Sequence, residues 1–520
     1  MTEATALCQE AEERLRPLFL TSALAAWDAN VVANDENEAR RVAADVALSD
    51  ALADPALYGR IVEARKGAAE GATRRQLDLL YGMTATSQAP EALRHRLVEL
   101  EAAVEGRFAQ HRGVVRGAEV TDNEILEILR RSNDIAERRE AWEASKTVGA
   151  LVAEDVRALA RLRNEIARSL GHRDWFAFAL DVSEMSEDKL FVTLDACDAA
   201  TRELFTRWKQ GVDAQLAERF GCGVDELRPW HYADPFFQDV PAEGGIDLDP
   251  LFADRDVVAL AGATFSGFGL PTDDVLARSD LYPRDAKCQH AFCLDVDRAG
   301  DVRVLANVRN DASWADTMLH ELGHAAYDLG YADSLPWLLR DCHLTMTEGI
   351  AIMMGALARD PEWLRTVAGF ELEESNGLQT AHAADALVFT RWVLVMTHFE
   401  RALYADPDAN LDTIWWELVA RFQGLTPPEE RQAPDWAAKI HIACAPVYYH
   451  TYLYGHLVAA QLRAAIRRTV GGLVGRPEAG AFLRERVFGP GASLRWDHLL
   501  EHATGEPLDV SFYAAELRLT

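Results

Sequence analysis

The sequence has no long hydrophobic run and no regular set of cysteines. No apolar stretch reaches the roughly 18 residues that a membrane-spanning helix needs. The first residues lead directly into charged, helix-like sequence, without the basic start and apolar core of a secretory signal. The seven cysteines are odd in number and match neither a disulfide framework nor a zinc ribbon. These absences predict a cytoplasmic protein with free thiols and no membrane segment.

Basic residues are outnumbered: 53 Lys and Arg stand against 83 Asp and Glu, which gives a formal net charge of −30. Such a charge repels phosphate backbones and anionic lipid surfaces, so we expect neither nucleic acid nor membranes as partners. A strongly solvated surface explains the acidic excess more simply than the steering of an acid-specific substrate does.

Helical periodicity dominates the chain. Apolar residues recur three or four positions apart, most clearly in residues 97–109, 152–170, 189–215 and 453–468. One stretch departs from this pattern, because residues 290–296 and 302–308 are typical of two strands joined by a turn at 297–301. No repeat or long linker divides the sequence. We therefore predict a mainly α protein with a single domain, 1–520, and one small antiparallel sheet.

The segment His320-Glu321-Leu322-Gly323-His324 has the spacing of a zinc-binding helix. Two histidines four residues apart project from one face of a helix, so their imidazoles can share one tetrahedral metal ion. Glu321 lies about 100° around the helix, where it can reach a water on the metal without being a ligand. Asn310 or Asp311 is a candidate N-cap for this helix. The alternative is a pair of surface histidines on an amphipathic helix.

A catalytic zinc needs a third protein ligand, and Glu348 is the candidate. It lies 24 residues after His324 within residues 345–354, an apolar segment that predicts a second, returning helix. A carboxylate beside Ile350 and Ile352 is costly to bury without a partner, and a zinc ion is such a partner. The alternative is a first-turn glutamate favoured by the helix dipole. We predict one zinc ion per chain, held by the two histidines and Glu348.

These residues resemble the angiotensin-converting-enzyme family of zinc peptidyl-dipeptidases, in which the glutamate ligand also follows the motif by 24 residues. The related thimet-oligopeptidase family is similar around the zinc but spaces that glutamate slightly differently. A more specific likeness is the block that comprises Trp415-Trp416, Gln423-Gly424-Leu425, Pro427-Pro428 and Lys439-Ile440-His441-Ile442. Further matches, Trp27 and residues 503–508, extend the likeness toward both ends of the chain.

The resemblance implies an almost entirely helical ellipsoid with a deep central cleft and zinc at its floor. It implies that His441 and a nearby tyrosine, Tyr452, stabilise the oxyanion, and that substrate is bound by His290, Ala291, Lys439 and Tyr449. Tyr449 and Tyr452 are three residues apart and so face the same way on a helix, although aromatic core packing is an alternative. The alignment needs a one-residue insertion between His441 and Tyr449.

The sequence also departs from the family. Residues 230–233 offer no glutamine where relatives bind the substrate carboxylate. Val419 and Thr451 stand where chloride-dependent relatives have arginines, and Ile352 stands where an aspartate orients a zinc histidine. Another group must therefore orient that histidine.

We predict zinc-dependent hydrolysis of short peptides by a monomer or homodimer, with Glu321 as the general base. The resemblance implies release of C-terminal dipeptides. An oligoendopeptidase similar to the thimet-oligopeptidase family and a non-catalytic peptide-binding protein are the alternatives.

Overall fold

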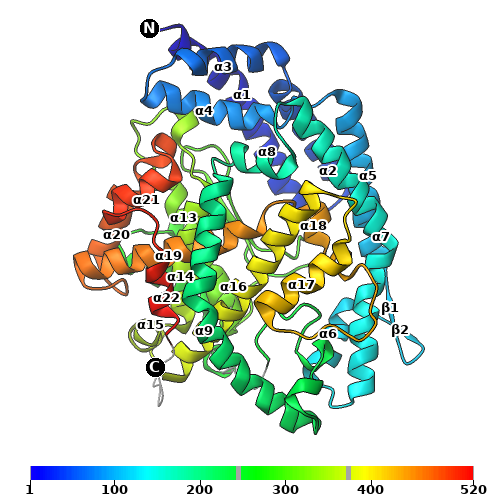
Figure 1. Ribbon diagram of the computed structural model, residues 1–520. Coiled ribbons are helices and arrows are strands. Elements are labelled where there is room, and N and C mark those ends of the chain that lie inside the picture. The colour runs from blue at the N-terminus through cyan, green and yellow to red at the C-terminus, as the bar shows by residue number, and fades with distance from the viewer. Residues whose placement is uncertain (1, 242–247, 371–375, 519–520) are drawn as a thin grey trace. The chain divides into compact units, whose positions relative to one another are not determined.

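The computed structural model describes residues 2–241, 248–370 and 376–518, and these residues are mainly helical (Figure 1). This confirms the predicted fold class. The described residues form two small sheets, each of them a two-stranded hairpin. The sequence predicted one such sheet. The chain forms two compact units, and each draws on segments far apart in the sequence.

Unit 1 is formed by Met1–Gln88, Asp247–Gln379 and Tyr454–Tyr513. Its helices and strands, with those that continue into unit 2 included, are α1 (Glu3–Val31), α2 (Asp35–Leu52), α3 (Pro55–Gly67), α4 (Ala72–Ala85), α10 (Asp249–Phe252), α11 (Val257–Gly267), α12 (Asp273–Arg278), β3 (Phe292–Asp295), β4 (Val302–Leu305), α13 (Ala312–Asp328), α14 (Leu344–Gly355), α15 (Pro361–Thr366), α19 (Tyr449–Val470), α20 (Pro477–Leu483), α21 (Trp496–Thr504) and α22 (Val510–Glu516).

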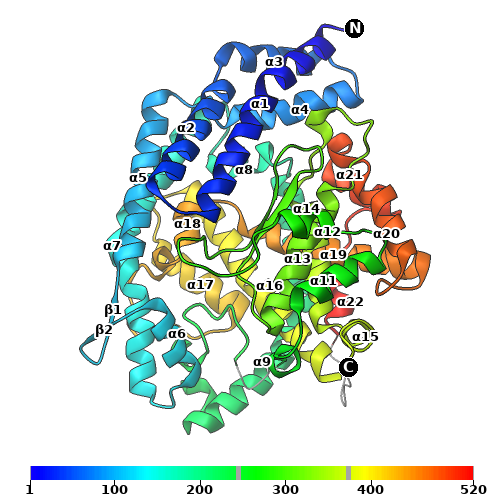
Figure 2. The same cartoon turned by 180° about the vertical axis from the view of Figure 1, so that it is seen from behind.

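The first four helices of unit 1 pack around a common apolar core. The side chain of Thr2 caps α1 by accepting a hydrogen bond from the Thr5 amide, and Asp54 caps α3 in the same way. Figure 2 shows α1 and α2 side by side. Their buried apolar faces meet those of α3 and α4 in a cluster that includes Leu7, Leu15, Ile61, Leu77 and Leu80.

The predicted hairpin is present as β3 and β4, with Phe292 opposite Leu305 and Asp295 opposite Val302. Its turn is stabilised by aspartates, because Asp295 accepts a hydrogen bond from the Arg298 amide at 2.8 Å. Strand β3 begins at Phe292, so His290 and Ala291 precede it, and the predicted start at residue 290 was two residues early.

Unit 2 is formed by Ala89–Ile246, Thr380–Leu453 and Ala514–Thr520. Its elements are α5 (Glu91–Gln110), β1 (Gly113–Val115), β2 (Ala118–Val120), α6 (Asp122–Arg131), α7 (Ile135–Ser169), α8 (Trp175–Val182), α9 (Glu187–Phe220), α16 (Asn376–Ala405), α17 (Leu411–Gln423) and α18 (Ile440–Cys444).

The long helix α7 runs through unit 2 and packs against α5, α6 and the segment before α18. Gly149 allows this last approach, because a Cβ there would lie 2.5 Å from the carbonyl oxygen of Pro434. The hairpin β1–β2 was not predicted. It turns at Arg116 and Gly117, which both have positive φ (51° and 78°), as a two-residue hairpin turn requires.

No helix among the described residues combines the length and apolar character that crossing a bilayer demands. All seven cysteines are free thiols.

Candidate metal centre

Helices α13 and α14 pack closely against each other in unit 1, and both views of the molecule show them side by side. Asp311 caps α13, and its side chain accepts a hydrogen bond from the Trp314 amide at 2.8 Å. Glycines permit the contact, because a Cβ at Gly323 would lie 3.0 Å from Cα of Ala351, and one at Gly355 would lie 2.5 Å from Asp316 Oδ1. Because the later residue of α13 pairs with the earlier residue of α14, the two helices are antiparallel.

The opposite side of α14 contacts α19. A Cβ at Gly349 would lie 2.5 Å from Cγ1 of Val458, and one at Gly455 would lie 3.3 Å from Cβ of Glu348. Helix α14 is thus fixed on both sides by close backbone approach. A helix held this tightly keeps Glu348 in one position.

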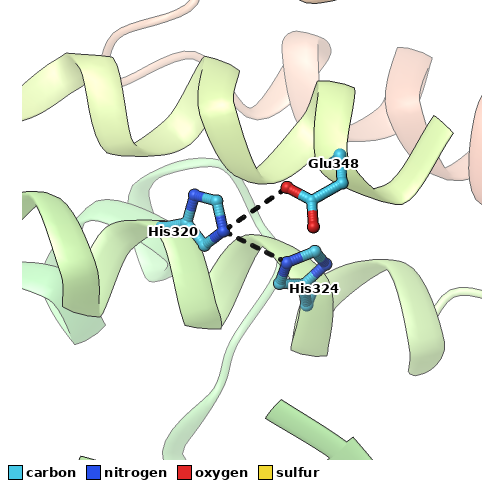
Figure 3. Close-up of side chains that lie close together, drawn as sticks. All are labelled: His320, His324 and Glu348. Atoms are coloured by element: carbon cyan, nitrogen blue, oxygen red, sulfur yellow. Dashed lines mark hydrogen bonds and ion pairs between the residues drawn. The ribbon is translucent and has the colours of Figure 1, made fainter. Parts of the chain in front are cut away.

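The side chains of His320, His324 and Glu348 converge between α13 and α14. Figure 3 shows the two histidines projecting from α13 and Glu348 projecting toward them from α14. The two Nε2 atoms are 3.3 Å apart, and His320 Nε2 is 3.8 Å from Glu348 Oε2. A tetrahedral zinc with bonds of about 2.0–2.1 Å holds two ligand atoms about 3.3–3.4 Å apart. Two imidazoles and one carboxylate at this spacing therefore fit a zinc ion.

Both histidines are in the protonation state that a metal needs. Burial lowers the pKa of His320 to about 4. Burial, and then the neighbouring His320, lowers the pKa of His324 to about 3. The imidazoles are therefore neutral near pH 7, with a lone pair available for a metal.

Glu321 lies next to this cluster but is not part of it. Its side chain is 8% exposed, and the backbone of Cys293 in β3 forms a hydrogen bond with it. Burial, and then the charge of Glu348, raises the pKa of Glu321 to about 7. A carboxyl group with a pKa near neutrality can both accept and return a proton.

The predicted substrate residues of unit 1 lie beside β3. His290 is exposed, and Ala291 is half-buried directly before the strand. Strand β3 pairs with β4 along one edge, and no second strand of the described residues pairs with it.

The other four predicted site residues, Lys439, His441, Tyr449 and Tyr452, lie in unit 2 around α18 and the start of α19. The rings of His441 and Tyr449 are 5.1 Å apart, and those of Tyr449 and Tyr452 are 5.7 Å apart. Burial, and then the charge of Lys439, lowers the pKa of His441 to about 4. Its Nδ1 is buried and has no hydrogen-bond partner in the described part of the chain.

Lys439 contacts a residue that sequence reasoning missed. Its Nζ donates a hydrogen bond to Gln238 Oε1 at 2.9 Å. Burial lowers the pKa of Lys439 to about 8, against the opposing effect of Asp234 and Asp239. Gln238 comes shortly after residues 230–233, the region in which relatives have a glutamine, and it is separated from Lys439 by 201 residues. An amide and an ammonium group at hydrogen-bonding distance are suited to bind a carboxylate.

Comparison with known sequences identifies the family of this chain. The sequence model of the family described as angiotensin-converting enzyme matches residues 1–221 and 276–512, which include both groups of predicted site residues. The chain belongs to the angiotensin-converting-enzyme family.

The curated relatives are distant. The angiotensin-converting enzyme of Theromyzon tessulatum is 24% identical over 239 residues, which cover 43% of this chain and 38% of that protein. The enzyme of Haematobia irritans exigua is 27% identical over 248 residues (43% and 40%), and an angiotensin-converting enzyme-related protein of Drosophila melanogaster is 25% identical over 257 residues (45% and 40%). The matched part of the chain spans about two fifths of these relatives.

Thr347 was also missed, and it bears on a departure of this chain from the angiotensin-converting-enzyme family. Ile352 cannot orient a zinc histidine, because it has no polar group. The hydroxyl of Thr347 instead lies 2.6 Å from Nδ1 of His324. The signal in the sequence was a hydroxyl residue directly before the predicted glutamate ligand.

Val419, at a position where chloride-dependent members of the family have an arginine, is buried and lines a small cavity with Lys146 and Asp435. The Lys146 ammonium already donates to the Pro235 carbonyl at 2.7 Å, and burial lowers its pKa to about 7. A chloride ion in this cavity would lie near the Asp435 carboxylate and near the Lys146 ammonium, whose hydrogen bond is already made to a carbonyl.

Proposed function

We propose that this chain is a zinc-dependent peptidase that acts on short peptides. The observation that carries the proposal is the convergence of His320, His324 and Glu348 at zinc-ligand spacing. The raised pKa of Glu321 beside them adds a general base, which a purely structural zinc site does not need.

In this proposal the two histidines and Glu348 hold the ion, and Glu321 moves protons. Zinc, when bound, supplies a Lewis acid that activates water and polarises the scissile carbonyl. Glu321 takes the proton of the attacking water and passes it to the leaving amine. Its burial suits this role, because a carboxyl group in a dry site exchanges a proton near neutral pH.

His441 and Tyr452 are proposed to donate hydrogen bonds to the oxyanion of the substrate. The low pKa of His441 keeps its imidazole neutral, so that one ring nitrogen carries a proton to donate and the other accepts. The ring of His441 lies 5.1 Å from that of Tyr449, which places the imidazole beside the tyrosines of α19.

Release of C-terminal dipeptides is proposed on the basis of Lys439, Gln238 and Tyr449. The first two form a hydrogen-bonded pair, and the Lys439 ammonium lies 5.7 Å from the centre of the Tyr449 ring. A free carboxylate could replace Gln238 Oε1 as the acceptor for Lys439. His290 and Ala291 are proposed to align the peptide backbone along β3.

Two measurements test the proposal. Zinc content should be one ion per chain in the wild type and should fall in Glu348→Ala, because one of three protein ligands is lost. A peptide with a free C-terminus should lose dipeptides sequentially, whereas its C-terminal amide should be cut far more slowly. Equal cleavage of both peptides at internal bonds would show an oligoendopeptidase instead, and zinc binding without turnover would show a binding protein.

A further inference from the structure

Residues 232–239 of unit 2 form neither a helix nor a strand, and a single carboxylate binds much of their backbone. Asp234 is 1% exposed. Its Oδ1 accepts a hydrogen bond from the Phe236 amide at 2.8 Å, and its Oδ2 accepts from the amides of Gln238 and Asp239, both at 3.0 Å. One buried side chain therefore supplies the acceptors that a helix or a sheet would otherwise supply.

Gln423, the last residue of α17, binds carbonyl groups of the same segment. Its side chain is fully buried, and Nε2 donates to the carbonyl oxygens of Phe236 at 2.9 Å and Phe237 at 2.8 Å. The Phe237 carbonyl and the Gln238 amide belong to one peptide plane, so Gln423 and Asp234 hold the two ends of that plane. The second amide that donates to Asp234 Oδ2 belongs to the following plane. Both peptide planes that flank Gln238 are therefore fixed.

The backbone at Phe237 needs this support. Its φ is 51°, a left-handed conformation that is unfavourable for a bulky residue and persists only where the surroundings enforce it. The Phe237 ring is buried and lies 4.4 Å from the ring of Tyr232. Since Phe237 directly precedes Gln238, its conformation sets the direction in which the Gln238 side chain leaves the segment.

Gln238 meets Lys439, which lies directly before α18. The Lys439 ammonium donates to Gln238 Oε1 at 2.9 Å. Lysine has a long, flexible stem, so the position of its ammonium depends on a fixed acceptor. The segment that carries Gln238 supplies that acceptor, and the segment is in turn held by Asp234 and Gln423.

We propose that Asp234 and Gln423 are positioning residues that hold Gln238 opposite Lys439 and thereby determine the preference for peptides with a free C-terminus. The inference rests on the carboxylate-binding role proposed above for Lys439 and Gln238. Asp234 and Gln423 act through the backbone of Gln238 and do not touch the substrate. Groups that are already ordered bind a ligand more tightly, because less conformational entropy is lost on binding.

The first test is Asp234→Asn. An asparagine side chain has one acceptor oxygen and directs an NH₂ group at backbone amides, so it cannot accept all three bonds. The readout is the ratio of kcat/KM for a peptide with a free C-terminus to kcat/KM for its C-terminal amide. This ratio should fall roughly 10- to 100-fold, mainly because KM of the free peptide rises. A merely structural defect would lower the turnover of both peptides and leave the ratio unchanged.

Asp174→Asn is the matched control for this variant. Asp174 is also a buried carboxylate of unit 2, but it caps α8 and accepts from the Ala177 amide at 2.9 Å. Its replacement should leave the ratio at the wild-type value.

A second variant keeps the inference testable if Asp234→Asn fails to fold. Gln423→Met removes the Nε2 donor at nearly constant length. The ratio should fall in the same direction but by a smaller factor, because Asp234 still holds the Gln238 amide. Zinc content should equal that of the wild type in both variants, since the zinc ligands proposed above lie in unit 1.

A double-mutant comparison shows whether the two residues act through Gln238. Gln238→Ala should itself lower the ratio. In that background Asp234→Asn or Gln423→Met should change the ratio little further, because the side chain that they position is absent. Effects that multiply independently would overturn the inference.

An unchanged ratio in both Asp234→Asn and Gln423→Met would also overturn it, provided that the wild type prefers the free peptide. A wild type that cleaves the two peptides equally would instead overturn the proposed carboxylate-binding role. A wild type without peptidase activity would overturn the proposed function, so the three failures are distinguishable.

Discussion

The two groups of predicted site residues are positioned in different ways. The cluster of His320, His324 and Glu348 in unit 1 lies on two regular helices, where an i, i+4 spacing alone sets both histidines on one face of α13. The His441–Tyr452 segment of unit 2 is not one helix, because α18 ends at Cys444 and α19 begins at Tyr449. Between them Val447 has φ 57°, a left-handed conformation that is rare for a β-branched residue.

Long-range contacts hold this interruption in place. The amide of Val447 donates to Glu400 Oε1 at 2.6 Å, and the Arg163 guanidinium donates to the Ala443 carbonyl. Glu400 and Arg163 lie on α16 and α7, far away in the sequence. The comparison teaches that side chains which converge from regular helices can be found from spacing, whereas residues on an interrupted segment depend on tertiary contacts that spacing does not reveal.

The largest expected effect concerns the helical cluster. Glu321→Gln removes the general base and leaves the three ligands, so kcat should fall roughly 10²- to 10⁴-fold. Zinc content should be unchanged. Turnover and metal content are measured on the same preparation, and near-normal turnover would remove Glu321 from its proposed role.

The next effect tests the register of the interrupted segment. Tyr452→Phe removes one oxyanion donor and should lower kcat roughly 10²- to 10³-fold with little change in KM. Tyr449→Phe is the matched control and should mainly affect KM for peptides with a free C-terminus. If the two variants exchange these effects, the assignment is shifted by one helical turn.

A smaller effect should follow from loosening the interruption itself. Glu400→Ala leaves the Val447 amide without its acceptor, which costs about 1–3 kcal/mol of stability. We expect a lower kcat with unchanged zinc content, because Tyr449 and Tyr452 move while the metal cluster does not. Glu400→Gln keeps an acceptor and should restore most of the activity. Zinc loss in Glu400→Ala would show that the two regions are not independent.

The smallest expected effect is that of chloride. Val419 offers no donor, the Lys146 ammonium is bound to a carbonyl, and Asp435 in the same cavity is already paired with Arg431. Activity should therefore be equal in chloride and in acetate at the same ionic strength and pH. Activation of tenfold or more by chloride would mean that a basic residue has replaced the missing arginine.

The sequence predicted α13, α14, the hairpin β3–β4 and the convergence of His320, His324 and Glu348, because periodicity and spacing are local properties. It did not predict Thr347 as the partner of His324, since that contact requires the two helices to be packed together. Gln238 was missed because its partner lies 201 residues away. The hairpin β1–β2 was missed because two three-residue strands carry almost no periodic signal.

The central claim is that one zinc ion lies between α13 and α14. X-ray diffraction of zinc-loaded crystals on both sides of the zinc absorption edge tests it most directly. We predict one anomalous peak per chain, at about 2.0–2.2 Å from Nε2 of His320, Nε2 of His324 and a carboxylate oxygen of Glu348. A zinc-loaded, active protein whose anomalous peak lies elsewhere, or which shows no peak, would contradict the claim.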